Sequence, residues 1–87
     1  MVSQKTTIRN LTGLNVRPAG IFCETAVKFK SKITFHYVGG VGNAKSVLNV
    51  LGAGIRNGET IEIVCDGEDE KEALLEMIKV IEDGLGE

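Results

Sequence analysis

Residues 12–29 read TGLNVRPAGIFCETAVKF, and they separate a stretch with the hydrophobic period of a strand from one with the period of a helix. Pro18 falls in the first helical turn, where its missing N–H costs no hydrogen bond. The apolar residues that recur at helical intervals are Ala19, Phe22, Cys23, Ala26 and Phe29. This spacing predicts a helix over about 16–29.

Three segments of the chain alternate between apolar and polar residues, as half-buried strands do. They span residues 2–9, 33–38 and 60–65. Gly39-Gly40 follows the second segment and predicts a hairpin to a further strand, which begins near Val41. The sequence therefore predicts four strands.

Two more helices are predicted after the hairpin. Ser46 stands where an N-cap residue would open a short helix over 47–51. Asp69 and Glu72 resemble a capping box at the start of a last helix over about 70–83. The apolar stripe of that helix consists of Ala73, Leu74, Met77, Ile78, Ile81 and Leu85. The expected element order is βαββαβα.

This order predicts an α+β fold. A chain of 87 residues is about the size of one small domain, so we expect a single domain over residues 1–87. The clean alternation in the strands favours one four-stranded antiparallel sheet. We expect the three helices on one face of this sheet and water on the other.

Composition narrows the classes of function. Ten basic and twelve acidic residues give a formal charge of -2, which provides no broad positive field for direct binding of nucleic acid or anionic lipid. No uncharged apolar run is long enough to form a membrane-spanning segment, so we expect no membrane insertion. Cys23 and Cys65 lie far apart without metal-ligand spacing. We therefore expect a cytoplasmic protein with reduced thiols and with no metal or cofactor.

The junction from Thr12 to Ala19 offers a place for an anion. A helix N-terminus presents unpaired backbone N–H groups and a partial positive charge, and Arg17 adds a fork of donors beside them. Phosphate or carboxylate would suit this arrangement. The alternative is purely structural: Asn15 caps the helix and Arg17 is a solvated surface charge.

The sequence contains TGLNVRPA at residues 12–19, NAKSVL at residues 43–48 and Asp66-Gly67. Together these segments resemble the HPr family, the small phosphocarriers of the bacterial sugar phosphotransferase system (PTS). The resemblance covers essentially the whole chain. It implies the open-faced β-sandwich of that family, which agrees with the element order expected above.

Position 15 departs from the family pattern. In carriers a histidine at this place accepts phosphate from enzyme I and passes it to sugar transporter subunits, whereas this chain has Asn15. A neutral imidazole has a nitrogen lone pair that attacks phosphorus, but the lone pair of a carboxamide nitrogen is delocalised into its carbonyl. We expect no phosphate on Asn15, and none on His36, the only histidine, which falls on the wet face of its strand.

Ser46 matches the second phosphorylation site of the family. The resemblance implies that HPr kinase/phosphorylase phosphorylates this serine from ATP and that the product binds a catabolite control transcriptional regulator. Phosphate on an N-cap serine meets free N–H groups and the positive end of the helix, so it adds charge at low structural cost. The alternative role, simple capping, is compatible with this one.

An apolar patch is expected beside Ser46 on the short helix, with Val50 turned toward the core on the other side. The resemblance implies that partners dock on this patch and on the arginine of the first junction. The predicted anion- and partner-binding residues are Asn15, Arg17, Val47, Leu48 and Leu51. Alternatively, the apolar members are buried helix contacts. Asn49 stands where the family usually has glycine.

Three functions remain open. One branch of the family, the catabolite-repression HPr-like proteins, has glutamine in place of the carrier histidine, and Asn15 is chemically alike. The first hypothesis is a non-catalytic regulatory adaptor in carbon catabolite control, phosphorylated at Ser46. The second is a phosphocarrier of sugar uptake that works with enzyme I, if Asn15 is an engineered replacement or another residue is the acceptor. The third is a binding module that needs no phosphorylation.

Overall fold

The computed structural model describes all residues from 1 to 87. The elements are β1 (Val2–Thr7), α1 (Val16–Val27), β2 (Lys32–Tyr37), β3 (Gly40–Asn43), α2 (Val47–Gly52), β4 (Thr60–Asp66) and α3 (Glu70–Glu82). The order βαββαβα is the predicted one, and each helix begins and ends close to its predicted bounds.

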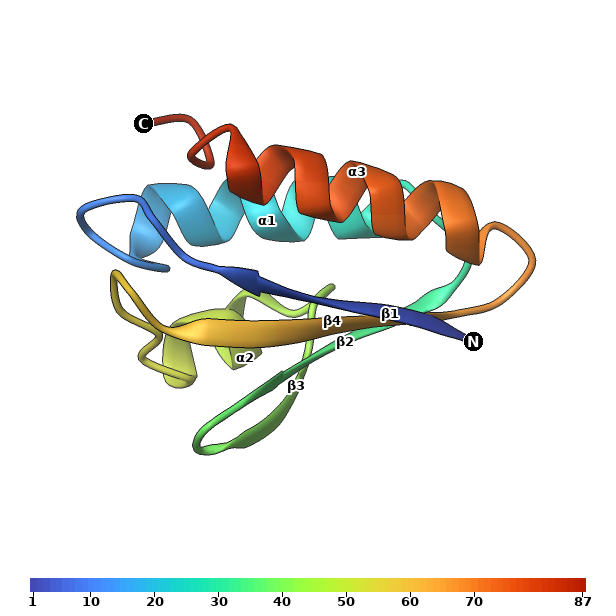
Figure 1. Ribbon diagram of the computed structural model, residues 1–87, viewed down its shortest axis with the longest axis horizontal. Helices are drawn as coiled ribbons and strands as arrows, with labels where there is room; N and C mark the ends of the chain where they lie inside the picture. The colour runs from blue at the N-terminus through green and yellow to red at the C-terminus, as the bar shows by residue number, and fades with distance from the viewer.

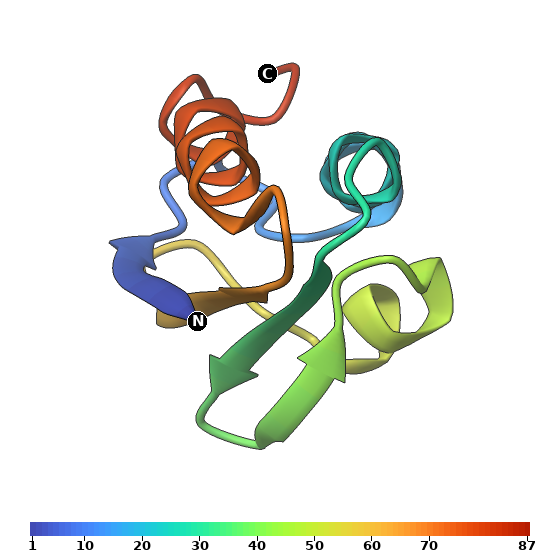
Figure 2. The ribbon, with the colours of Figure 1, turned by 90° about the vertical axis from the view of Figure 1, so that its right-hand side faces the viewer.

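The four strands form one antiparallel sheet in the order β1-β4-β2-β3. In the middle of the sheet, Ile63 of β4 pairs with Gln4 of β1 on one side and with Phe35 of β2 on the other. Helices α1 and α3 lie side by side over one face, and α2 lies beside the β3 edge next to α1 (Figures 1 and 2). The predicted fold class is confirmed.

One hydrophobic core fills the space between the helices and the sheet. Phe22 of α1 meets Phe35 of β2 edge to face, with ring centroids 5.7 Å apart. Val50 is the one buried residue of α2, as the sequence predicts. The other face of the sheet carries exposed polar side chains, His36 among them, so the sandwich is open on that side.

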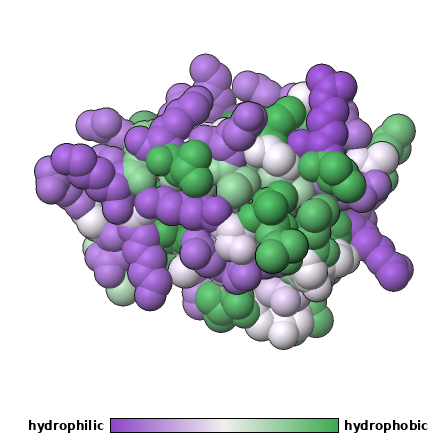
Figure 3. All heavy atoms as spheres, turned by 180° about the vertical axis from the view of Figure 1, so that it is seen from behind, coloured by the Kyte–Doolittle hydropathy of each residue, from purple (hydrophilic) through white to green (hydrophobic).

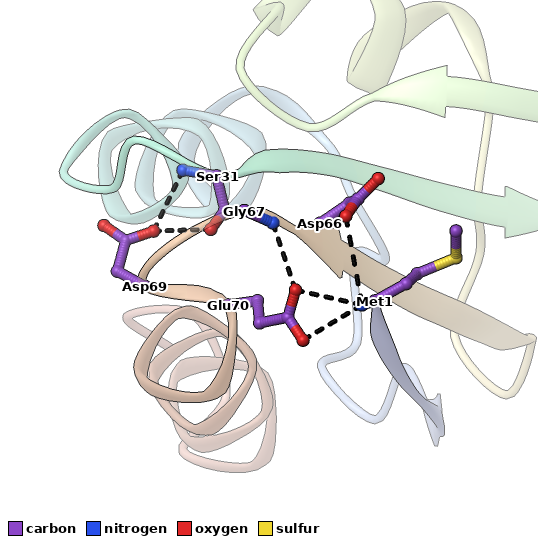
Figure 4. A network of polar contacts seen from close by, with 6 residues as sticks. All are labelled: Met1, Ser31, Asp66, Gly67, Asp69 and Glu70. Carbon is purple, nitrogen blue, oxygen red and sulfur yellow. Dashed lines mark hydrogen bonds and ion pairs between the residues drawn. The ribbon is translucent and has the colours of Figure 1, made fainter.

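The predicted capping box at the start of α3 is wrong. Asp69 holds the N-cap position, but its side chain makes no capping hydrogen bond. Its carboxylate instead accepts hydrogen bonds from the backbone N–H and the hydroxyl of Ser31, at 2.9 and 2.5 Å (Figure 4). It also accepts one from the backbone N–H of Lys30 at 2.9 Å. Lys30 and Ser31 belong to the loop between α1 and β2, which lies next to the start of α3. Because they donate to the Asp69 carboxylate, it does not cap α3.

Glu70 accepts the local hydrogen bond at the start of α3 and also contacts the first residue of the chain. Its Oε1 accepts a hydrogen bond from the backbone N–H of Gly67 at 3.1 Å and lies 3.0 Å from the amino group of Met1 (Figure 4). Hydrogen bonds, first from the Ser31 hydroxyl and then from the backbone N–H of Lys30, lower the pKa of Asp69 from 3.8 to about 2. The two carboxylates therefore join α3 to the loop before β2 and to the first residue of the chain.

Candidate functional site

The junction before α1 is held against the loop between α2 and β4. The N–H of Leu14 donates to the carbonyl of Ile55 at 2.9 Å, and Leu14 is buried. Gly13 has a φ of +64°, and a Cβ there would collide with the Ile55 carbonyl oxygen. Glycine is therefore required at position 13, and the close approach leaves Asn15 on the surface.

Asn15 begins α1 through its backbone alone. Its carbonyl accepts a hydrogen bond from Ala19 N at 2.8 Å, but its side chain makes no capping hydrogen bond. The backbone N–H groups of Val16 and Arg17 have no partner in the protein, and Pro18 has no N–H to offer. The first turn of α1 thus presents two free donors and an exposed carboxamide to solvent.

Arg17 is exposed and makes no ion pair within the chain. The turn at the end of the sequence packs next to it: a Cβ on Gly86 would lie 3.7 Å from Arg17 Nε and would collide with Ile21. In the same turn, Glu87 accepts a hydrogen bond from the Thr12 hydroxyl at 2.9 Å. This turn was not predicted at the junction, and Gly84 and Gly86, which both adopt a positive φ in it, are its only local signal in the sequence.

Ser46 caps α2 through its side chain. Ser46 is half-buried, and its hydroxyl oxygen accepts a hydrogen bond from the backbone N–H of Asn49 at 3.2 Å, so the predicted N-cap is confirmed. The same oxygen accepts a second hydrogen bond, from the side-chain amide of Asn49 at 3.1 Å. In the sequence, Asn49 differs from the residue usual in the family, and that difference alone does not predict this contact.

The segment before Ser46 is attached to α1. The Lys45 ammonium donates to the carbonyl of Phe29, just beyond the end of α1, at 2.6 Å. The thiol of Cys23, a half-buried residue of α1, donates to the carbonyl of Lys45 at 3.1 Å. Asn43 accepts a hydrogen bond from Lys45 N at 2.9 Å through its side chain. The contacts of Lys45 and Cys23 hold this segment against α1, whereas the Asn43 side chain bonds only within the segment.

The predicted patch on α2 is exposed, so the alternative of buried helix contacts is wrong. The exposed fractions are 41% for Val47, 78% for Leu48 and 37% for Leu51, against 0% for Val50. Because α2 packs on α1, this patch lies on the side of the molecule that carries both helices. Figure 3 views that side and shows hydrophobic side chains gathered there with hydrophilic ones around them.

A family model described as the PTS HPr component phosphorylation site matches residues 2–83. The chain belongs to the HPr family. The HPr-like protein Crh of Halalkalibacterium halodurans is 37% identical to it over 82 residues, which cover 94% of this chain and 98% of Crh. The phosphocarrier protein HPr of Mycoplasma genitalium is 44% identical over 68 residues, or 77% of each chain. The crystal structure of HPr-C-His from Thermoanaerobacter tengcongensis matches with a TM-score of 0.96 at 36% identity and covers 100% of this chain and 98% of that one.

The similar proteins include both functional types of the HPr family. Crh is named as an HPr-like protein, and the Mycoplasma protein is named as a phosphocarrier. The chain is therefore an HPr-family phosphocarrier or a Crh-like regulatory protein of the PTS. The side chains at the two helix junctions are the features that bear on this choice.

Other groups that could support chemistry in an HPr protein lie away from both junctions. His36 is exposed on β2, on the face of the sheet opposite to the buried Ile33 and Phe35. Cys65 is fully buried, and this burial raises the pKa of its thiol from 9.0 to about 11. No three His, Cys, Asp or Glu side chains gather closely enough to hold a metal ion. None of the helices has the length and apolar character that crossing a bilayer requires.

Proposed function

We propose that this protein is a non-catalytic regulatory adaptor of the HPr family that acts in the cytoplasm as a single domain over residues 1–87. HPr kinase/phosphorylase phosphorylates Ser46, and the product docks on a catabolite control transcriptional regulator. The observation that carries this proposal is the contrast between an exposed carboxamide at Asn15 and a hydroxyl in a fixed position at Ser46.

Asn15 occupies the place that we assign to the phosphoryl-accepting histidine of carriers. Its surroundings suit an anion, because two backbone N–H groups and the exposed Arg17 lie at the same helix start. The carboxamide nitrogen nevertheless has no lone pair available to attack phosphorus near pH 7. In this proposal the junction serves as a polar contact for partners and does not relay phosphate.

Ser46 and the patch next to it supply the regulated surface. Phosphate on the hydroxyl would bring about two negative charges to the positive end of α2. The exposed side chains of Val47, Leu48 and Leu51 would lie beside that phosphate, and Arg17 would contribute from the α1 junction. A partner that combines basic side chains with an apolar surface fits this combination.

The test is a binding measurement with purified proteins. We expect treatment with HPr kinase/phosphorylase and ATP to add one phosphate at Ser46, and the product to bind the regulator at least tenfold more tightly than the unmodified chain in calorimetry. Ser46→Ala should show neither the modification nor the gain. If the unmodified chain and Ser46→Ala bind as tightly as the phosphorylated chain, the protein is instead a binding module that needs no phosphorylation.

The second candidate is a phosphocarrier of sugar uptake, which the identity with the Mycoplasma phosphocarrier favours. This function requires a nitrogen acceptor other than the Asn15 carboxamide, and His36 is the one imidazole in the chain. Enzyme I and phosphoenolpyruvate would then label the protein, and His36→Ala would abolish the label. Under the regulatory proposal neither form is labelled.

A further inference from the structure

The side chain of Asn49 makes a contact that no backbone cap requires. Its Nδ2 donates to Ser46 Oγ at 3.1 Å, while its Oδ1 accepts a hydrogen bond from the backbone N–H of Asn43 at 3.0 Å. The amide therefore bridges the end of β3 and the hydroxyl at the start of α2. A capping box would have placed a Glu or Gln here and turned it toward the N-cap backbone N–H.

This bridge engages the second lone pair of the hydroxyl. A serine oxygen has two acceptor positions. The backbone N–H of Asn49 takes one of them, as in any capped helix, and the Asn49 side chain takes the other. The Ser46 hydroxyl thus accepts two hydrogen bonds, and nucleophilic attack requires one of these lone pairs.

We propose that Asn49 is a positioning residue that restrains the Ser46 hydroxyl as a phosphoryl acceptor, an inference that rests on the proposed phosphorylation of Ser46. In that reaction a lone pair of Ser46 Oγ forms a bond to the γ-phosphorus of ATP. The bond between this phosphorus and the β,γ-bridging oxygen breaks, and ADP leaves with the electron pair. The hydroxyl proton passes to a base of the kinase. The Asn49 amide must release the oxygen before this attack.

The exposure of Asn49 makes this release feasible. Asn49 lies on the solvent side of α2, so its side chain can rotate away without disturbing the core, and its backbone N–H can still cap the helix. Rotation breaks the hydrogen bond to Ser46 Oγ and the one from Asn43 N, but the exposed Asn43 N–H can bond to water instead. The net cost is about one neutral hydrogen bond, which corresponds to a change of about 2- to 10-fold in rate. The side chain therefore sets how readily Ser46 is modified.

The experiment compares kcat/KM for phosphorylation of the full chain by HPr kinase/phosphorylase with ATP. We expect Asn49→Ala and Asn49→Gly each to raise kcat/KM by about 2- to 10-fold. Alanine favours a helix and glycine disfavours one. If the effect came from the stability of α2, the two variants would therefore differ in kcat/KM. Asn43→Ala is the matched control, because it removes the Asn43–Lys45 hydrogen bond and leaves the backbone N–H that holds Asn49. It should leave kcat/KM unchanged.

Side-chain amide signals of Asn49 in the NMR spectrum report the contact without the kinase, and Ser46→Ala should shift them. The inference is overturned if Asn49→Ala and Asn49→Gly are phosphorylated no faster than the unaltered chain, or if Asn43→Ala gains as much as they do. In both cases phosphorylation of Ser46 itself would stand. If no form of the chain is phosphorylated, the proposed function fails, and the restraint fails with it.

Discussion

The starts of α1 and α2 both carry a polar residue at the N-cap position, but the two residues are held differently. Asn15 makes no side-chain hydrogen bond at its helix and faces solvent near Arg17. Ser46 accepts two hydrogen bonds and follows a segment attached to α1 by Lys45 and Cys23. The difference teaches that a polar residue at a helix start need not stabilise the helix. At α1 the side chain makes no such contact, whereas at α2 it is a structural cap and, in our proposal, also the phosphoryl acceptor.

The largest change should come from restoring an imidazole at the first junction. We expect Asn15→His to accept phosphate from enzyme I and phosphoenolpyruvate, because the free N–H groups and Arg17 are already in place. The gain should be on the order of a hundredfold or more over the unaltered chain, since a nucleophile replaces a group without one. The measurement is the amount of acid-labile radioactive phosphate that each protein receives from labelled phosphoenolpyruvate, detected by autoradiography.

Asn15→Gln is the matched control for that substitution, because it retains a carboxamide and adds one methylene. It should remain unlabelled. Equal labelling of the unaltered chain, Asn15→Gln and Asn15→His would show that residue 15 is not the acceptor, and the contrast between the two junctions would lose its chemical meaning.

A second substitution tests whether the α2 surface is the docking site. Leu48→Asp should weaken binding of the Ser46-phosphorylated chain to the regulator by about tenfold or more, because it places a charge in an apolar contact. Leu75→Asp on α3 is the control, since Leu75 is 74% exposed against 78% for Leu48. Calorimetry gives both affinities. Equal losses in the two variants would argue against a specific patch on α2.

A smaller effect is expected on stability, where alanine substitutions at Ser46 and Asn15 should differ in the free energy of unfolding. Ser46→Ala removes the acceptor of the capping hydrogen bond and should lower the free energy of unfolding by about 1 kcal/mol. Asn15→Ala removes no capping hydrogen bond and should cost clearly less. Urea denaturation of both variants checks this order. The reverse order would mean that Asn15 stabilises its helix through its side chain in solution.

The start of α3 provides a third case, with a smaller effect that depends on pH. Hydrogen bonding lowers the pKa of Asp69 from 3.8 to about 2. Its stabilising contribution is therefore present above about pH 4 and is lost as the pH falls through about 2. Asp69→Asn should flatten the fall in unfolding temperature between these values in acid titrations followed by circular dichroism. An unchanged profile would show that the contacts with Lys30 and Ser31 do not persist in solution.

Local patterns in the sequence were sufficient for the fold. Alternation identified three strands, and the Gly39-Gly40 turn identified the fourth. Helical spacing and cap residues identified the three helices, and Val50 was correctly expected to face the core. The capping box at Asp69 failed because the competing donors come from Ser31, which is 38 residues away in the chain. No local pattern contains such a partner.

The sequence predicted which residues stand at the starts of α1 and α2, but not the contacts that they make. Ser46 as an N-cap followed from its place before an apolar run, and the exposure of the patch agreed with the expectation for α2. The turn that brings Gly86 against Ile21 depends on tertiary packing, so the sequence could not place it beside Arg17. The contact of Asn49 with Ser46 could have been predicted from the sequence, because Asn49 lies three residues after Ser46, at the position of the second residue of a capping box.

Labelling with two phosphoryl donors in parallel tests the central claim most directly. One sample of the unaltered chain receives ATP and HPr kinase/phosphorylase, and the other receives phosphoenolpyruvate and enzyme I. Mass spectrometry then locates the phosphate, and acid treatment distinguishes a phosphoester from a phosphoramidate. We predict acid-stable phosphate on Ser46 in the first sample and no phosphate in the second. Acid-labile phosphate in the second sample that passes on to a sugar transporter subunit would contradict the account.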